Sequence, residues 1–206
     1  AAAKYYRWGP IARNRADLAR RIAQWGAAND NPVSALRDLR DIDITFRGGG
    51  TLQDASRDMP EMPQAYPECT MFGTLPAYGF YARHVKGLTL DNVRMSWSSS
   101  DDRPAFIGED VFDLTIRGLK AESTDKTPDM IVLKNVDTAM ITGCTGPRSS
   151  NVPFLHLLGN YRQVSVIGND LRHTNTPWRI DERGEQKGTN DFYQAANAVQ
   201  IRTQQP

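Results

Sequence analysis

The sequence of 206 residues contains only two cysteines and three histidines. These are the residues that form stabilising disulfides in small folds and that most often bind metals. Cys69 and Cys144 form no CxxC pair and have no metal-ligand spacing, so two free thiols are favoured over a disulfide, which stays open. A zinc site would need carboxylates that the fold brings to a histidine such as His156. We therefore expect no metal and no cofactor.

Net charge and long apolar runs are also lacking. The formal net charge is +1, which gives no support to binding of the nucleic acid backbone. No apolar run approaches the 18 or more residues that read as a membrane span. We therefore expect neither a nucleic acid nor a membrane among the partners.

The common catalytic motifs are absent as well. The chain has no GxSxG, no HExxH and no cysteine–histidine signature. Gly48-Gly49-Gly50 follows a strand-like segment, but no phosphate-binding GxxxxGK[ST] or GxGxxG accompanies it. The three glycines are therefore interpreted as a turn.

What the chain does contain is a repeat between about residues 79 and 177. Each unit has a polar residue, an apolar residue, two mostly polar residues and then an apolar–x–apolar alternation. The four windows start at His84, Asp110, Asn135 and Asn160, with offsets of 26, 25 and 25 residues. A fixed period in this range indicates a solenoid, and the alternation indicates strands. The sequence predicts an all-β protein, a parallel β-helix of about 25 residues per coil.

The repeat also predicts which residues stack. One inward column contains Leu88, Leu114, Ala139 and Val164, and a second contains Leu90, Ile116, Ile141 and Val166. Asp110, Asn135 and Asn160 share one corner, where turn residues that tolerate a left-handed backbone are favoured over a ligand site. His156 alternates with Leu155 and Leu157 and is expected to face outward.

The domain organisation follows from the flanks of this repeat. Residues 1–30 are predicted to be a lead-in with a short amphipathic α-helix from Asn14 to Trp25. Capping of the solenoid end by this helix is favoured over binding to a membrane surface or an acidic partner. Residues 31–206 are predicted to be the β-helix, with a long loop insertion at 47–76. Ile42 and Ile44 are placed opposite Leu88 and Leu90, and a last short strand is expected at 198–201.

The candidate site residues are aromatic and arginine side chains that lie near one another in the sequence. Tyr78 and Tyr81 lie near Arg83 and Arg103 in sequence, and aromatic rings with guanidinium groups suit sugar rings and sugar carboxylates. These four residues are the candidate substrate-binding residues. The adjacent pair Asp101-Asp102 is favoured as a corner over a catalytic pair, because neighbouring side chains in a corner splay apart.

A resemblance to a known family covers roughly residues 31–145. It is carried by Gly48-Gly49-Gly50-Thr51, Tyr66-Pro67-Glu68, Met71-Phe72-Gly73, Pro76-Ala77-Tyr78-Gly79-Phe80, Arg83-His84-Val85-Lys86-Gly87-Leu88 and Asp102-Arg103-Pro104-Ala105-Phe106. This order of motifs resembles the C-terminal part of bacterial family 28 glycoside hydrolases, the polygalacturonase-like enzymes. The resemblance implies a right-handed parallel β-helix, a pectic or other acidic polysaccharide as partner, and a secreted or periplasmic location.

The family's catalytic motifs do not appear in this chain. It has no Asn-Thr-Asp, no Gly-His-Gly and no Arg-Ile-Lys, so no catalytic residue is assigned. We expect a polygalacturonase-like hydrolase relative that lacks the catalytic aspartates, in which an upstream segment or a second chain completes the β-helix. The alternative is a non-catalytic carbohydrate-binding or structural β-helix module.

Overall fold

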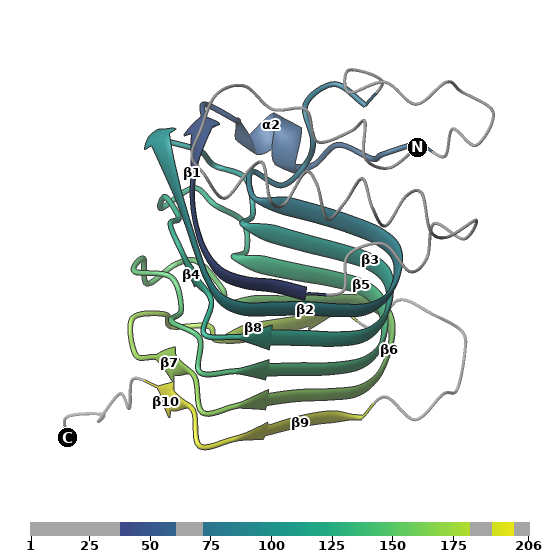
Figure 1. The fold of residues 1–206 in the computed structure, drawn as a ribbon. Coiled ribbons are helices and arrows are strands. Elements are labelled where there is room, and N and C mark those ends of the chain that lie inside the picture. The colour runs from purple at the N-terminus through teal and green to yellow at the C-terminus, as the bar shows by residue number, and fades with distance from the viewer. Residues whose placement is uncertain (1–37, 61–71, 182–190, 200–206) are drawn as a thin grey trace, which may run out of the picture.

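The computed structural model describes residues 38–60, 72–181 and 191–199. Almost all of the regular structure in these ranges is β-strand (Figure 1), and the one helix described there is the single turn α2 (Leu52–Ala55). The strands are β1 (Asp38–Gly48), β2 (Phe80–Ser99), β3 (Phe106–Arg117), β4 (Lys120–Ala121), β5 (Ile131–Thr142), β6 (Leu155–Ile167), β7 (Asp170–Leu171), β8 (Trp178–Asp181), β9 (Phe192–Ala195) and β10 (Ala198–Val199).

The strands stack in parallel, one above the other. The main sheet runs in the order β1-β2-β3-β5-β6-β8, with β9 paired to β6 and β4 paired to β2. Each long strand bends around the molecule and returns one level lower, as the ribbons in Figure 1 show. The chain is a parallel β-solenoid of about four turns, which confirms the architecture predicted from the repeat.

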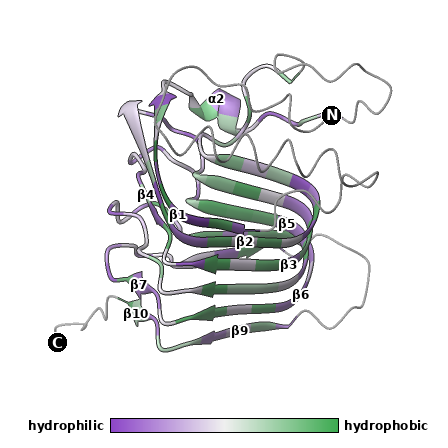
Figure 2. Cartoon of the chain, in the orientation of Figure 1, coloured by the Kyte–Doolittle hydropathy of each residue, from purple (hydrophilic) through white to green (hydrophobic). Residues whose placement is uncertain are grey.

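The core contains the two columns predicted from sequence, together with buried apolar residues from the other faces of the coils, such as Phe106, Leu133 and Leu157. Leu88 pairs with Leu114, Leu114 with Ala139, and Ala139 with Val164. The second column, Leu90, Ile116, Ile141 and Val166, is completely buried. Figure 2 shows hydrophobic segments that recur along the stacked strands. Because strands stack about 4.8 Å apart, each apolar side chain packs on its equivalent in the coils above and below.

The corners confirm the interpretation of Asp110 and Asn135 as turn residues. Their φ angles are 51° and 55°, in the left-handed region that aspartate and asparagine tolerate. In the next coil, one extra residue shifts the register, and Gly159 takes the left-handed position with φ 68° in place of Asn160. The Asn160 amide donates a 3.1 Å hydrogen bond to Asn135 Oδ1, so the corner residues also link neighbouring coils.

The predicted register of the first strand is wrong. Leu39, not Ile44, lies opposite Leu90, and Ile42 and Ile44 pair with Val93 and Met95. The corner explains the difference, because Asp41 with φ 52° stacks on Asn92 with φ 52°. The Asn92 amide donates a 2.8 Å hydrogen bond to Asp41 Oδ1. Ile42 and Ile44 therefore lie on the face after this corner.

The Gly48-Gly49-Gly50 segment forms a turn, as predicted. Gly48 and Gly49 have φ angles of 74° and 90°. A Cβ at position 48 would lie 1.8 Å from the Ser99 carbonyl oxygen, so the close approach of the two coils requires glycine there. Helix α2 follows with a reciprocal capping box between Thr51 and Asp54, a feature that the sequence analysis missed.

Several sequence predictions concern residues outside the described ranges. The predicted helix from Asn14 to Trp25 lies there, and so does Cys69. The division of the chain into a lead-in of residues 1–30 and a β-helix of residues 31–206 stays a prediction. Cys144 has a free, buried thiol, and burial raises its pKa to about 11. Strand β10 covers the first half of the strand predicted at 198–201. In the described ranges, no helix is long and apolar enough to cross a membrane.

Candidate functional site

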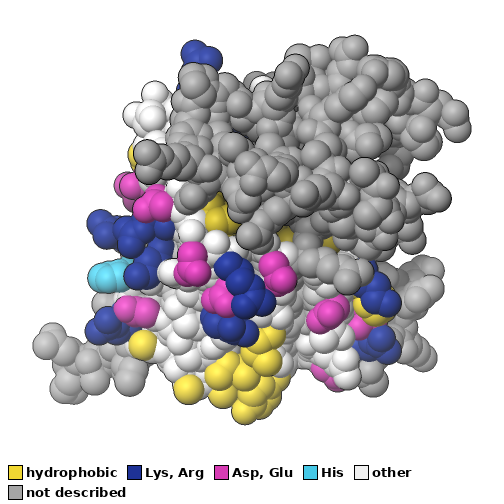
Figure 3. Space-filling view, in the orientation of Figure 1, with side chains coloured by type: hydrophobic (Ala, Val, Ile, Leu, Met, Phe, Trp, Pro, Cys, Tyr) yellow, Lys and Arg dark blue, Asp and Glu magenta, His cyan; other side chains and the backbone are white. Residues whose placement is uncertain are grey.

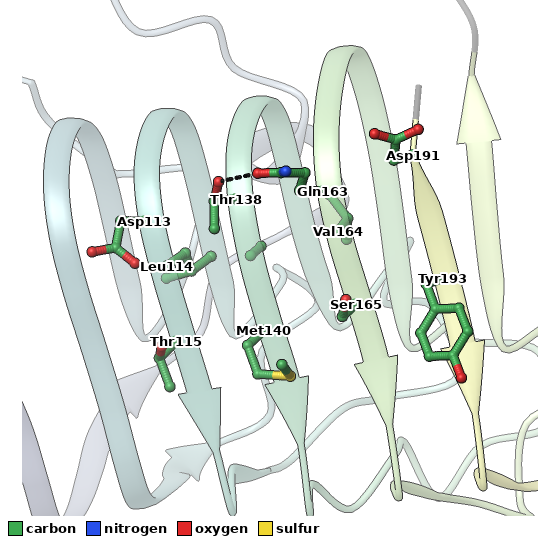
Figure 4. Close-up of a pocket in the computed structure, with 11 residues that line it drawn as sticks. Asp113, Leu114, Thr115, Thr138, Met140, Gln163, Val164, Ser165, Asp191 and Tyr193 are labelled. Atoms are coloured by element: carbon green, nitrogen blue, oxygen red, sulfur yellow. Dashed lines mark hydrogen bonds between the residues drawn. The ribbon is translucent and has the colours of Figure 1, made fainter. Parts of the chain in front are cut away.

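A groove of about 400 Å³ lies on the outward surface of β3, β5, β6 and β9. It runs across the strands, parallel to the stacking direction of the coils (Figure 4). Its lining residues are Asp113, Leu114, Thr115, Thr138, Ala139, Met140, Gln163, Val164, Ser165, Asp191 and Tyr193.

One row of the groove consists of the middle residues of the alternating windows. Thr115 pairs with Met140, Met140 with Ser165, and Ser165 with Tyr193, one residue per coil. Since the neighbours of Thr115, Met140 and Ser165 on either side point into the core, these three side chains point outward. Tyr193 continues the row by its pairing with Ser165 and is exposed. The alternation in the sequence contained this information for the first three residues. The alternation alone does not indicate that these outward residues form a site.

A second row lies next to the corner, formed by Asp113, Thr138, Gln163 and Asp191. The first three have φ angles of 58°, 62° and 50°. A β-branched residue such as Thr138 is rarely found at positive φ, and such strain costs on the order of 1–3 kcal/mol. Thr138 Oγ1 donates a 3.1 Å hydrogen bond to Gln163 Oε1, drawn as the dashed line in Figure 4. The row is thus a fixed series of polar groups.

The groove offers both apolar and hydrogen-bonding surface. The Tyr193 side chain is 59% exposed and Met140 is 41% exposed, both high values for large apolar groups. Figure 3 shows hydrophobic side chains gathered over the lower strands of the face turned to the viewer, next to intermixed acidic and basic side chains. A face with this mixture suits a ligand that has apolar and hydroxyl surfaces together.

The only charged groups among the described lining residues are Asp113 and Asp191. They occupy equivalent positions three coils apart, which corresponds to ~14 Å at the strand spacing. Figure 4 places them at opposite ends of the row, with Thr138 and Gln163 between them. The two carboxylates therefore do not form a close pair.

The structure brings two of the predicted site residues together, at a different place. The Tyr81 hydroxyl donates a 2.7 Å hydrogen bond to Glu109 Oε2, and Arg83 Nε donates one of 3.0 Å to the same atom. Lys134 Nζ lies 2.7 Å from Glu109 Oε1. This group lies on the face before the Asp110 corner, and none of its members lines the groove.

Of the other two predicted site residues, Tyr78 is buried and Arg103 is partly buried. Tyr78 is 4% exposed, and its hydroxyl donates a 2.8 Å hydrogen bond to the Glu122 carbonyl. Arg103 forms a 2.6 Å ion pair with the fully buried Asp101 and donates to the Leu75 carbonyl at 2.9 Å. Both side chains therefore hold neighbouring segments of the fold together.

The Glu109 group makes stability depend on pH. Burial by itself raises the pKa of Glu109, but hydrogen bonds from Lys134, Tyr81 and Arg83 outweigh it and lower the pKa to about 2. A carboxylate with a lowered pKa stabilises the fold fully above its ordinary value of 4.5, and this contribution is lost as the pH falls toward 2. Glu109→Gln should lower the free energy of unfolding at pH 7 by about 1–3 kcal/mol.

Urea unfolding at pH 7 and pH 2.5 measures this effect. The difference between wild type and Glu109→Gln should shrink at the lower pH. Asp43→Asn is the matched control, since the Asp43 side chain is 68% exposed and its contact with Arg94 is 3.7 Å long. An effect of Glu109→Gln that stays constant between the two pH values would contradict the assignment.

A third constellation surrounds His156. Its Nδ1 lies 3.0 Å from Asp129 Oδ2 and its Nε2 lies 3.1 Å from Asp181 Oδ2, while Arg179 Nη2 lies 3.2 Å from Asp129 Oδ2. The expectation that His156 faces solvent is wrong, because these groups from neighbouring coils cover it to 5% exposure. The imidazole ring fills the space between the two carboxylates. Within the described ranges, no group of histidine, cysteine, aspartate and glutamate has an arrangement that could hold a metal ion.

No protein-family model, curated protein or solved structure matches the chain. The resemblance to family 28 glycoside hydrolases therefore rests on the sequence motifs alone.

Proposed function

We propose that this protein binds a polysaccharide along the groove on β3, β5, β6 and β9 without cleaving it. The observation that carries the proposal is the pair of rows, each with one residue per coil. Groups that recur about every 4.8 Å along a straight groove suit a ligand that is itself a chain of repeating units. Solenoids use such extended surfaces for binding.

The side chains in the rows suit sugars. Thr115, Ser165 and Gln163 each offer a donor and an acceptor, as sugar hydroxyls do. Tyr193 adds an exposed aromatic ring with a polar tip, which can pack on the apolar face of a sugar ring. Met140, between Thr115 and Ser165, adds adaptable apolar surface.

The positions of the carboxylates favour binding over hydrolysis. An inverting glycosidase needs two carboxyl groups about 6.5–9.5 Å apart, and a retaining one about 5–5.5 Å. Asp113 and Asp191 are separated by three coils, ~14 Å. Asp129 and Asp181 both contact the ring of His156, which leaves no space between them for a glycosidic bond.

Hydrolysis of a pectic or other acidic polysaccharide, the activity implied by the resemblance, is the second proposal. The parallel solenoid is consistent with it, but the family's catalytic motifs are absent from the chain. The right-handed sense of the coils belongs to this proposal and is supported by the strong preference of parallel crossovers for that hand. Completion of the solenoid by an upstream segment or second chain, and a secreted or periplasmic location, are proposed on the same resemblance.

Tyr193→Ala tests the binding proposal. Loss of an exposed aromatic anchor should weaken binding by at least about fivefold, the equivalent of 1 kcal/mol. Affinity gel electrophoresis with dissolved polysaccharides measures it. Phe112→Ala is the matched control, because Phe112 is 48% exposed on β3 but does not line the groove. Equal retardation of both variants would contradict the proposal, and release of reducing ends would favour hydrolysis.

A further inference from the structure

The charges around the groove narrow the class of polysaccharide, on the assumption that the groove binds one as proposed above. We infer that the ligand is a neutral polysaccharide and not a polyuronide. The lining residues that the structure describes contain two carboxylates, Asp113 and Asp191, and neither lysine nor arginine. This differs from the acidic ligand expected from the sequence.

Among the residues that the structure describes, the basic side chains that border the groove already contact groups of this chain. Arg162 Nε donates a 3.1 Å hydrogen bond to Asp137 Oδ1, one position outside the corner row. Arg117 Nη1 lies 3.1 Å from Asp91 Oδ2 on the opposite border. A sugar carboxylate would share either guanidinium with a carboxylate of this chain, which already neutralises its charge, so less attraction would be gained than from an unpaired arginine.

A further cation near the groove in the described ranges is Lys86, on β2. Lys86 Nζ lies 5.9 Å from the centre of the Phe112 ring, in a cation–π contact. A polyuronide carries one carboxylate on each sugar, so a chain in the groove would bring several of them past Asp113 and Asp191. Two like charges 4 Å apart in water repel by about 1 kcal/mol, and salt screens this beyond about 8 Å at physiological ionic strength.

A neutral chain meets no such repulsion. Its hydroxyls can donate to the carboxylates of Asp113 and Asp191, and hydrogen bonds to charged acceptors are stronger than those to neutral ones. Both carboxylates are exposed and ready to accept them. The two aspartates would then fix the ends of a stretch of sugar units, with Thr138 and Gln163 between them.

Polygalacturonate and its fully methyl-esterified form are a matched pair of probes, since they share backbone and linkage and differ in charge. The test uses these two, together with galactan, xylan and mixed-linkage glucan as neutral chains and alginate as a second acidic chain. Affinity gel electrophoresis at low salt with the full 206-residue chain compares them. We expect retardation by at least one neutral chain and by neither acidic chain, with no loss of neutral binding in 0.5 M salt.

A double variant, Asp113→Asn with Asp191→Asn, tests whether these two carboxylates repel an acidic polysaccharide. Asparagine tolerates the positive φ of position 113, so the backbone is preserved. The variant should raise the affinity for polygalacturonate by about fivefold for each repulsion of 1 kcal/mol removed. Binding of polygalacturonate by the wild type as tightly as any neutral chain, lost in Tyr193→Ala, would overturn this inference and leave the binding proposal standing. Absence of binding to every chain would overturn both.

Discussion

Replacing Phe106 by alanine is expected to lower the free energy of unfolding by about 3–5 kcal/mol. Phe106 is fully buried at the start of β3, paired with Phe80 above and Ile131 below. The ring also lies in the close packing around Gly108, where an added Cβ would be 3.2 Å from Phe106 Cε1. Its removal leaves a cavity between coils whose backbones are fixed by continuous hydrogen-bonded ladders, so little of the space can be refilled.

Phe112→Ala in the same strand is the control for this experiment. Phe112 is 48% exposed, and its removal, including the loss of its cation–π contact with Lys86, should change stability by no more than about 1 kcal/mol. Urea unfolding followed by far-UV circular dichroism compares the two variants. Equal losses of stability would mean that the inward and outward assignments on β3 are wrong.

These assignments were available from the sequence because the repeat has a fixed period. A residue such as Leu114 is apolar, its neighbour Thr115 is not, and the same pattern returns in the next window at Ala139 and Met140. Only stacking satisfies all windows at once, and it sets the register to the residue. The two columns and the first three residues of the outward row were therefore predictable.

In the first coil the repeat pattern does not set the register. Apolar alternation occurs twice in a coil, once before the Asn92 corner and once after it, at Val93 and Met95. Ile42 and Ile44 match either position equally well by pattern. The register is set by Asp41, the corner residue that matches Asn92. Its φ angle shows that it is a corner residue, and the sequence pattern does not.

The last coil of the groove was missed for a different reason. Phe192-Tyr193-Gln194-Ala195 has glutamine where the other windows have a second inward apolar residue, and Gln194 pairs with Val166. Among the described strands, β9 pairs with β6 alone, so Gln194 has no further described coil to pack on and is exposed. The repeat pattern that predicts an outward position for Thr115 therefore does not predict one for Tyr193.

The predicted role of Arg103 depended on residue type alone. An arginine beside aromatic residues suits a sugar carboxylate, but the sequence does not show that Asp101, two positions earlier, folds back on it. Asp101 is fully buried and accepts hydrogen bonds from Arg103 Nε at 2.9 Å and from the Gly50 amide at 2.9 Å. The corner thereby ties the glycine turn after β1 to the end of β2.

Replacing Asp101 by asparagine is therefore expected to destabilise the fold by about 3–5 kcal/mol, since it leaves the guanidinium of Arg103 without its buried counter-charge. Burial raises the pKa of Asp101, but the hydrogen bonds from Arg103 and Gly50 outweigh it and hold the pKa below its ordinary 3.8. The contribution is present above pH 3.8 and is lost as the pH falls below that value. Urea unfolding at pH 7 and at acid pH measures both effects.

Asp102→Asn is the control that separates structure from catalysis at this corner. Asp102 accepts a 2.7 Å hydrogen bond from Thr124 Oγ1 and is only half-buried, so its replacement should change stability by about 1 kcal/mol. If Asp101 is structural, Asp101→Asn lowers stability several times more than Asp102→Asn does, and Asp102→Asn leaves polysaccharide binding nearly unchanged. Full stability of Asp101→Asn, together with loss of any release of reducing ends, would instead make the Asp101-Asp102 corner the catalytic centre of a hydrolase.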